Sequence, residues 1–470
     1  MLLSWQKKFG LAVLALLIAW QIGLWIDLPF PNGDGIWSLS QTFSLLRGEF
    51  LKSTFGHNYW PIVQVQYLYS VFTAPFYGLY HMLFMHMEYS IFVFNELLLV
   101  FLLWLLYRLL TEAKNASPLF VFVSLVCVFT SPYSMNLRPE LLNIVGMVLV
   151  LFVLRKYGKE PSIKWIVITA LLTVLVGIVH PIGGILTIIL VGLFGWRHKF
   201  QIPFYWKYVG GVVLGLLILY VPIVAIDVRS WLSQMMVFSA GGADSHTFSP
   251  ELVKKYFFLA PGLPALYLVA LWTNRGKGSL SELLVFCSLL LVFAFLGRSY
   301  YFPYLTVFIF WRFSELQKCE LRPILAFLFA AISPFMSHYV PTVQQLENRA
   351  YVRGFKESLD VVRNYADYSE SHRVWVTGQL AMPVIDRPGA RLYVPSYVKL
   401  AGQPMRFQNG DILFYMGTPE KDKKLWTNLG MPQDSLAMER TIGPISGLLR
   451  ADEFFSGRTE ELSLWNIRKR

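Results

Sequence analysis

Residues 165–196 read WIVITALLTVLVGIVHPIGGILTIILVGLFGW, a stretch in which His180 is the only ionisable side chain. An apolar run of about 17 residues or more is long enough to cross the hydrocarbon core of a bilayer as a helix. Proline disfavours helical backbone at the residue before it, so His180-Pro181 divides the stretch in two. The stretch therefore predicts two neighbouring transmembrane helices joined by a tight turn.

Similar apolar runs recur along the chain as far as about Tyr339. The sequence of 470 residues is 55% hydrophobic and only 15% charged, with a mean hydropathy of +0.49. A soluble protein carries about 25% charged residues. We therefore predict an all-α polytopic membrane protein with about eleven transmembrane helices. The predicted spans are roughly 10–28, 89–108, 117–134, 139–154, 164–180, 181–196, 208–226, 256–273, 281–297, 301–315 and 322–340.

The Lys and Arg residues of the loops predict the orientation. With the N-terminus inside and 62–84 not spanning, the inner loops hold sixteen of them and the outer loops hold seven. Cytoplasmic loops carry such an excess, so the distribution favours a non-spanning 62–84. Its many tyrosines favour an interfacial segment, and Pro61 and Pro75 are expected to break it. The outer face then collects residues 29–88 and 227–255, with everything after about 341.

The residues after 340 have a different character. They have ordinary charge density and short alternating runs such as Arg373–Val376 and Ile412–Tyr415, which are typical of strands. We therefore predict two domains. Residues 1–340 form a transmembrane domain whose first outer loop covers 29–88, and residues 341–470 form a small extracytoplasmic α/β domain.

The net charge of +12 would point to nucleic acid in a soluble protein. Here the basic residues gather in short loops between apolar runs, so the predicted partner is the lipid bilayer and not nucleic acid. Cys127, Cys287 and Cys319 lie within or beside apolar segments and show no metal-ligand spacing. Neither a disulfide framework nor a zinc site is therefore expected.

Asp34 is the leading candidate for a catalytic residue. It lies in Asn32-Gly33-Asp34-Gly35, just after the first predicted span, and the pattern from Ile36 to Leu46 predicts an amphipathic helix at the interface. A carboxylate on the outer face is a candidate base for an acceptor nucleophile. The alternative is that Asp34 only caps the helix that follows it.

Four candidate binding residues lie in predicted outer turns and loops. Arg138 and Glu140 begin a span, where a guanidinium binds phosphate through paired N–H groups and a carboxylate suits the first helical turn. His180 lies in the turn described above, and His57 lies in the first outer loop. The alternative for Arg138 is a side chain that only extends to the membrane interface, and the alternative for His180 is a residue that only marks a turn. No second ligand stands at metal spacing from His180, so no metal site is predicted.

Arg298 and Tyr301 are candidates at another outer turn, Arg298-Ser299-Tyr300-Tyr301-Phe302-Pro303. The arginine is suited to a lipid phosphate and the tyrosines to isoprene or sugar, although an aromatic belt with an extended arginine explains the same residues. Residues 227–255, with Arg229 and His246, fit either a substrate-capping loop or an ordinary solvated loop.

Taken in order, these features resemble the GT-C superfamily of membrane glycosyltransferases, especially the branch of protein O-mannosyltransferases and the aminoarabinose transferase of lipid A. The resemblance covers residues 1 to about 340 and a terminal extracytoplasmic domain. It is carried by Asp34, the juxtamembrane segment Ile36 to Arg47, Tyr59-Trp60-Pro61, the basic helix end at Arg108, Arg138 and Arg298-x-Tyr300. The family often has Asp-Glu in the first loop, whereas Asp34 is followed by Gly35.

The resemblance implies an enzyme that moves a hexosyl or pentosyl group from a polyprenyl-phosphate sugar to a lipid, glycan or protein acceptor. It makes Asp34 the catalytic carboxylate and assigns the lipid phosphate to Arg138 and Arg298. No metal or other cofactor is expected, and the predicted location is a bacterial inner membrane with the site facing the periplasm.

Two rival functions remain open. An O-antigen polymerase or ligase would depend on Arg229 and His246 rather than on Asp34. A flippase or transporter of lipid-linked sugars should carry ionisable residues midway through its spans, where Glu96 is nearly alone.

Overall fold

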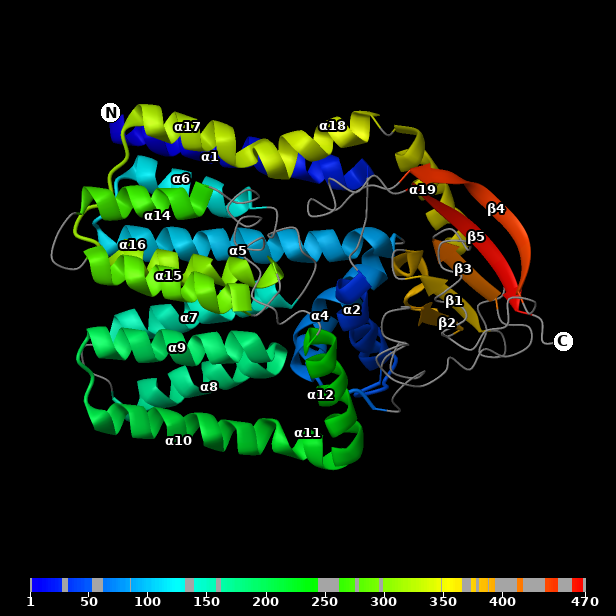
Figure 1. The fold of residues 1–470 in the computed structure, drawn as a ribbon, viewed down its shortest axis with the longest axis horizontal. Coiled ribbons are helices and arrows are strands. Elements are labelled where there is room, and N and C mark those ends of the chain that lie inside the picture. The colour runs from blue at the N-terminus through cyan, green and yellow to red at the C-terminus, as the bar shows by residue number, and fades with distance from the viewer. Residues whose placement is uncertain are drawn as a thin grey trace. The chain divides into compact units, whose positions relative to one another are not determined.

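A computed structural model gives the fold. The structure describes residues 2–27, 33–52, 62–84, 86–131, 139–157, 162–243, 262–274, 279–295, 299–347, 349–365, 373–377, 380–387, 389–393, 412–416, 436–446 and 459–467. This part of the chain is mostly helical and includes a five-stranded sheet near its end (Figure 1). The chain divides into two compact units.

The first unit, called here the helical unit, consists of Met1–Ile22, Asn95–Ile226 and Gly242–Val340. All or most of each of the following helices belongs to it: α1 (Leu2–Asp27), α5 (Ser90–Ala113), α6 (Pro118–Phe129), α7 (Glu140–Tyr157), α8 (Ile163–Val179), α9 (Pro181–Arg197), α10 (Ile202–Leu219), α11 (Val221–Ile226), α14 (Gly262–Thr273), α15 (Ser279–Phe295), α16 (Leu305–Glu315) and α17 (Pro323–Pro334). Every segment predicted as a span overlaps at least one of these helices, so helix formation is confirmed over the described residues of those segments.

Three of the described helical segments are long and apolar enough to cross a membrane, namely Lys8–Ile26, Met87–Ala113 and Ile202–Ile226. Shorter apolar helices accompany them, among them α8 and α9. Membrane insertion is therefore compatible with the composition and length of these helices.

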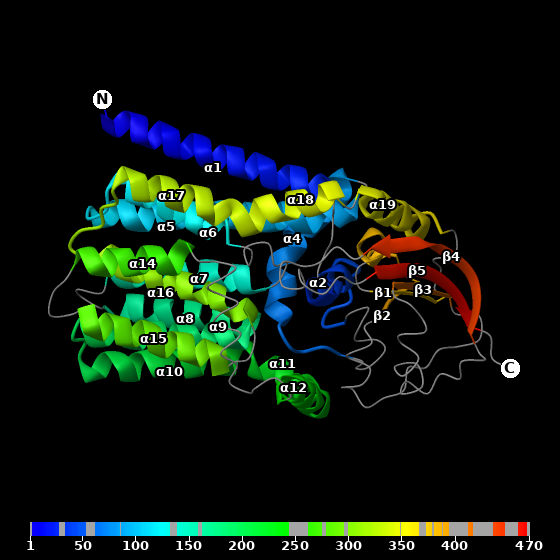
Figure 2. The same cartoon turned by 45° about the horizontal axis from the view of Figure 1, so that its top comes forward.

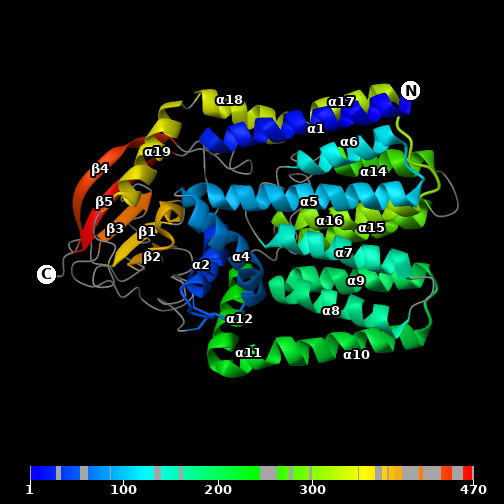
Figure 3. The same ribbon diagram turned by 180° about the vertical axis from the view of Figure 1, so that it is seen from behind.

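Helices α8 and α9 form the predicted pair and lie side by side (Figures 1 and 3). His180 joins them as a single extended residue (φ −158°, ψ 124°), and Pro181 opens α9. The two backbones approach closely, because a Cβ on Gly184 would lie 2.6 Å from the Gly177 Cα. Glycine therefore lets the helices pack without a side chain between them at this point.

Several polar side chains of the helical unit pair with one another. At the end of α16, the Glu315 carboxylate lies 2.9 Å from His198 Nε2 and also pairs with Arg197. Gln21 of α1 donates a hydrogen bond to Glu96 of α5. Such pairing offsets the cost of removing a charge from water.

The second unit, called here the composite unit, consists of Gly23–Phe94, Asp227–Gly241 and Pro341–Arg470. Its elements are α2 (Gly33–Leu46), α4 (Tyr67–Leu83), the 3-10 helix Met87–Tyr89, most of α12 (Val228–Ala243), most of α18 (Val340–Glu347), α19 (Arg349–Arg363), the 3-10 helix Met382–Val384, β1 (Val374–Thr377), β2 (Ala390–Tyr393), β3 (Ile412–Met416), β4 (Leu436–Ser446) and β5 (Thr459–Ile467).

The predicted domain boundary at residue 340 coincides with a boundary of the composite unit. The sequence grouped residues 23–94 and 227–241 with the transmembrane domain, but in the structure they fold with the terminal residues. Contacts such as the hydrogen bond from Gln345 Nε2 to the Leu24 carbonyl (2.9 Å) join these distant segments.

The strands form one mixed sheet in the order β2-β1-β3-β5-β4. Strand β1 pairs in parallel with β2 and β3, whereas β5 pairs antiparallel with β3 and β4. Helix α19 lies beside the strands (Figure 2) and buries Phe355, Leu359 and Val362 on one face. The strands predicted near 373–376 and 412–415 are confirmed as β1 and β3.

Helices α2 and α4 pack on each other through polar side chains. The hydroxyl oxygens of Thr42 and Thr73 lie 2.7 Å apart, and Ser70 Oγ donates to Gln41 Oε1 at 3.1 Å. All four side chains are buried. The helix predicted after Asp34 is thus present, but part of its polar face is covered by α4 instead of facing lipid headgroups.

Segment 62–84 supplies α4, and the prediction that Pro75 breaks it was wrong, because α4 continues through this residue. A proline removes one helical hydrogen bond, and packing must offset that loss. The Tyr77 ring does so by contacting Phe43 and Phe94, with ring centroids 5.8 and 5.5 Å away.

Residues 228–243 form helix α12 in a region where the sequence predicted a loop. The Asp227 carboxylate caps this helix by accepting a hydrogen bond from the Ser230 amide (2.9 Å), which holds the pKa of Asp227 below its ordinary value. Buried Gln234 donates to the Ile62 carbonyl (2.8 Å) and accepts from the Gln64 amide (3.0 Å). Over these residues the structure supports a docked helix and not a mobile loop.

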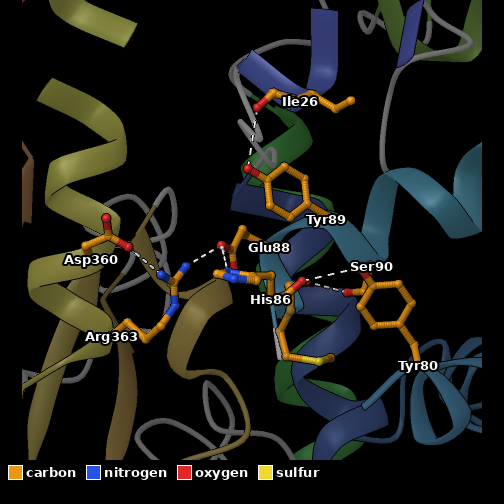
Figure 4. A network of polar contacts seen from close by, with 9 residues as sticks. Ile26, Tyr80, His86, Glu88, Tyr89, Ser90, Asp360 and Arg363 are labelled. Carbon is orange, nitrogen blue, oxygen red and sulfur yellow. Dashed lines mark hydrogen bonds and ion pairs between the residues drawn. The ribbon is translucent and has the colours of Figure 1, made fainter. Parts of the chain in front are cut away.

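A buried ion pair joins the first and last segments of the composite unit (Figure 4). Arg363, the last residue of α19, donates to Glu88 and to Asp360, and His86 Nδ1 lies 3.1 Å from Glu88 Oε1. The Glu88 side chain is only 3% exposed, so the guanidinium compensates a carboxylate that water scarcely reaches.

Replacing Arg363 by Met should destabilise the composite unit by about 3–5 kcal/mol, because it leaves the Glu88 carboxylate buried without its cation. The double variant Glu88→Leu, Arg363→Met should regain much of this loss. As a control, Arg353→Met removes the exposed pair with Glu357 and should cost less than about 1 kcal/mol. Denaturant unfolding followed by tryptophan fluorescence measures all three, and equal effects at Arg363 and Arg353 would contradict the assignment.

Candidate functional site

Three of the residues predicted to bind substrate come together in the helical unit. Glu140 is the first residue of α7, His180 is the turn between α8 and α9, and Tyr301 lies in the 3-10 helix Ser299–Tyr304 that precedes α16. Helices α7, α8 and α9 lie side by side (Figures 1 and 3), which brings the start of α7 next to the α8–α9 turn.

The side chains of these residues make a group of polar and aromatic contacts, in which Glu140 and His180 are buried and Tyr301 is partly buried. His180 Nε2 lies 4.0 Å from Glu140 Oε1, and the two side chains are 9% and 6% exposed. The His180 and Tyr301 rings have centroids 5.9 Å apart, and Tyr304 lies beside Tyr301 at 6.5 Å. These four residues and Asn143 are called here the polar cluster.

Local sequence explains two of these positions. A carboxylate at the start of a helix is stabilised by the free backbone amides of the first turn, which suits Glu140. Pro181 favours extended backbone at the residue before it, which places His180 between two helices.

The sequence placed Tyr301 at the start of a span over 301–315, and this boundary was wrong. Residues 299–304 form a 3-10 helix that contains Pro303, and α16 begins at Leu305. Proline lacks the backbone donor for a helical hydrogen bond, and a short 3-10 turn is common where an α-helix begins. Tyr301 therefore lies before the helix, within the polar cluster.

Asn143 also belongs to the polar cluster, although it was not among the predicted site residues. It is 1% exposed, and its Nδ2 donates to the His180 carbonyl and to the Tyr304 hydroxyl, both at 3.2 Å. The available signal was its place one turn after Glu140, ahead of a run without polar side chains from Ile144 to Leu154, since residues three apart share a helix face.

The polar cluster combines a carboxylate, an imidazole, an amide and two phenols. These groups supply hydrogen-bond donors and acceptors next to aromatic faces, as sites for hydroxyl-rich ligands require. Within the described ranges, no group of three or more His, Cys, Asp or Glu side chains is placed to hold a metal ion.

For the other predicted site residues, the structure describes only the backbone or does not describe the residue. Asp34 is the second residue of α2 in the composite unit, and its side chain is not among those that the structure describes. His57, Arg138 and Arg298 lie outside the described residues. In sequence, Arg138 stands two residues before Glu140, and Arg298 directly precedes the 3-10 helix with Tyr301.

Comparison with known proteins does not place the chain in a family. No protein-family model matches the sequence, and a search of the curated proteins finds no match.

The Asn143 side chain packs closely against the Gly183 backbone, and this predicts the effect of an alanine at Gly183. A Cβ there would lie 2.7 Å from Asn143 Cγ and closer still to Nδ2, so Gly183→Ala must displace the amide and should cost about 1–3 kcal/mol. Gly192, also in α9, has open space around its Cα, so Gly192→Ala should stabilise the protein by about 0.5–1 kcal/mol. Thermal unfolding in detergent distinguishes the two, and a Gly183→Ala midpoint at or above wild type would refute the packing.

Proposed function

We propose that this chain is a polytopic GT-C-like glycosyltransferase that acts at the outer face of a membrane. It moves a sugar from a polyprenyl-phosphate donor to a lipid, glycan or protein acceptor. In this proposal about eleven helices span a bacterial inner membrane, and the composite unit faces the periplasm.

The observation that carries the proposal is the polar cluster. Glu140, His180 and Tyr301 were predicted from separate stretches of sequence as substrate-binding residues, and the structure places the Glu140 carboxylate and the Tyr301 ring beside His180. Polar groups that converge among apolar helices are typical of a ligand site. In the proposal they hold the transferred sugar, with the Tyr301 ring along its apolar face.

The make-up of the composite unit supports the predicted orientation. The distribution of Lys and Arg assigned residues 29–88, 227–255 and those after 341 to one side of the membrane. Segments 23–94, 227–241 and 341–470 form the composite unit, so most residues of these three regions share one compact unit. Segments that fold together outside the bilayer must lie on the same side of it.

The proposed reaction is a displacement at the anomeric carbon of the donor sugar. An acceptor hydroxyl attacks this carbon while Asp34 takes its proton, and the bond from the carbon to the phosphate oxygen breaks. The lipid phosphate leaves with the bonding electrons. Arg138 and Arg298 are proposed to stabilise the charge that develops on it.

Donor turnover tests this proposal. Purified protein in nanodiscs receives radiolabelled polyprenyl-phosphate sugars and a crude membrane fraction as acceptor. Asp34→Asn should lower transfer by about 10²–10⁴-fold with donor binding retained, because it removes the general base. Arg138→Ala and Arg298→Ala should each lower it by about 10²-fold or more.

The matched control is Asp227→Asn. Asp227, like Asp34, is predicted to lie on the outer face of the membrane, and asparagine can cap α12 as aspartate does. This variant should transfer sugar at the wild-type rate. Equal transfer by wild type and Asp34→Asn would remove Asp34 from the mechanism. Loss of transfer on changing Arg229 or His246, with Asp34→Asn active, would favour a polymerase or ligase instead.

A further inference from the structure

The side-chain amide of Asn143 connects the elements that build the polar cluster. Its Nδ2 carries two hydrogens and has two acceptors at 3.2 Å, the His180 carbonyl in the α8–α9 turn and the Tyr304 hydroxyl at the end of the 3-10 helix. Asn143 itself lies on α7, one turn after Glu140. One side chain therefore joins all three elements that carry the binding residues.

The surrounding structure fixes the place of this amide. The Asn143 backbone amide donates to the Pro139 carbonyl (3.1 Å), which anchors its position in the first turn of α7. The amide fills the space above the Gly183 Cα, where even one added carbon atom would collide with it. Because both the length and the direction of the side chain are restricted, a change at Asn143 must alter the contacts of His180 and Tyr304.

We propose that Asn143 is a positioning residue, which sets His180 and the Tyr301–Tyr304 pair relative to Glu140 without contacting the sugar. The effect of Asn143 on catalysis rests on the proposed function, because it concerns binding of the donor sugar. The effect of Asn143 on the α8–α9 turn is independent of that function, because the same hydrogen bonds hold the turn in the unliganded protein.

The structural part is tested by hydrogen exchange on unliganded protein. The Gly184 amide lies 3.4 Å from the His180 carbonyl, close to the turn that Asn143 holds. Asn143→Ala should speed exchange at residues 182–186 by about tenfold or more, while α10 exchanges as in wild type. The nearly isosteric Asn143→Asp should act in the same direction, since a carboxylate cannot donate to the His180 carbonyl.

The matched control is Gly146→Ala, one turn further along α7. A Cβ there would lie 2.5 Å from Val176 Cγ2, so it disturbs the packing of α7 on α8 without changing a member of the polar cluster. The proposal expects a change in exchange for Asn143→Ala that exceeds any change for Gly146→Ala. Equal changes for both, or none for Asn143→Ala, overturn it.

Kinetics test the catalytic part. Asn143→Ala should lower kcat/KM for the donor by about 10²-fold, the usual effect of an error of about 1 Å in position. Tyr304→Phe should have a smaller effect, and the double variant should be no worse than Asn143→Ala, because both remove the same hydrogen bond. Additive losses in the double variant would show that the two residues act separately and would overturn the positioning role.

The two failures are distinguishable. If wild type transfers no sugar from any donor, the proposed function fails and the exchange experiment alone decides whether Asn143 positions the cluster. If wild type is active and Asn143→Ala stays within about twofold of it, the positioning role fails and the proposed function stands.

Discussion

A polar side chain buried among apolar helices must find a partner, and this requirement shapes both units of the protein. In the helical unit Asn143 donates to the His180 carbonyl, and the Glu140 carboxylate lies 4.0 Å from His180 Nε2, where α7 and α9 begin and α8 ends. In the composite unit it pairs Glu88 with Arg363. An unpartnered group at these positions would cost several kcal/mol, so the pairs restrict how the surrounding elements can pack.

The composite unit shows how distant parts of the chain are combined. Its segments are separated in sequence by long stretches of the helical unit, yet buried side chains such as Gln234 and Arg363 connect them. Asp34 lies on α2, whose buried threonine and glutamine contacts with α4 make it part of a packed structure. In the proposed mechanism, the catalytic carboxylate is thus carried by a helix that packs on α4.

Much of the helical unit follows from local sequence. Apolar runs predicted its helices because each run is long enough for several turns, and proline marked the turn at His180. The strands near 373–376 and 412–415 were also predicted, because alternation of side chains is a local signal. Chemistry at helix ends identified Glu140, His180 and Tyr301, although their contact could not be foreseen without the packing of α7, α8 and α9.

The features that escaped prediction depend on contacts between residues far apart in sequence. Pro75 was expected to break a helix, but the packing of Tyr77 between Phe43 and Phe94 offsets the lost hydrogen bond. Residues 228–243 read as a loop, and buried Gln234 docks them as a helix. Asn143 stands one turn after Glu140 in the sequence, but only its hydrogen bonds to His180 and Tyr304 reveal what it connects.

The central claim is that Glu140, His180 and Tyr301 of the polar cluster hold the sugar of a lipid-linked donor. The most direct test is photo-crosslinking with a polyprenyl-phosphate hexose that carries a diazirine on the sugar, followed by peptide mapping. The account predicts labelling in residues 140–157 and 299–304, abolished by excess unmodified donor. Competable labelling confined to other segments, such as 228–243, would contradict it.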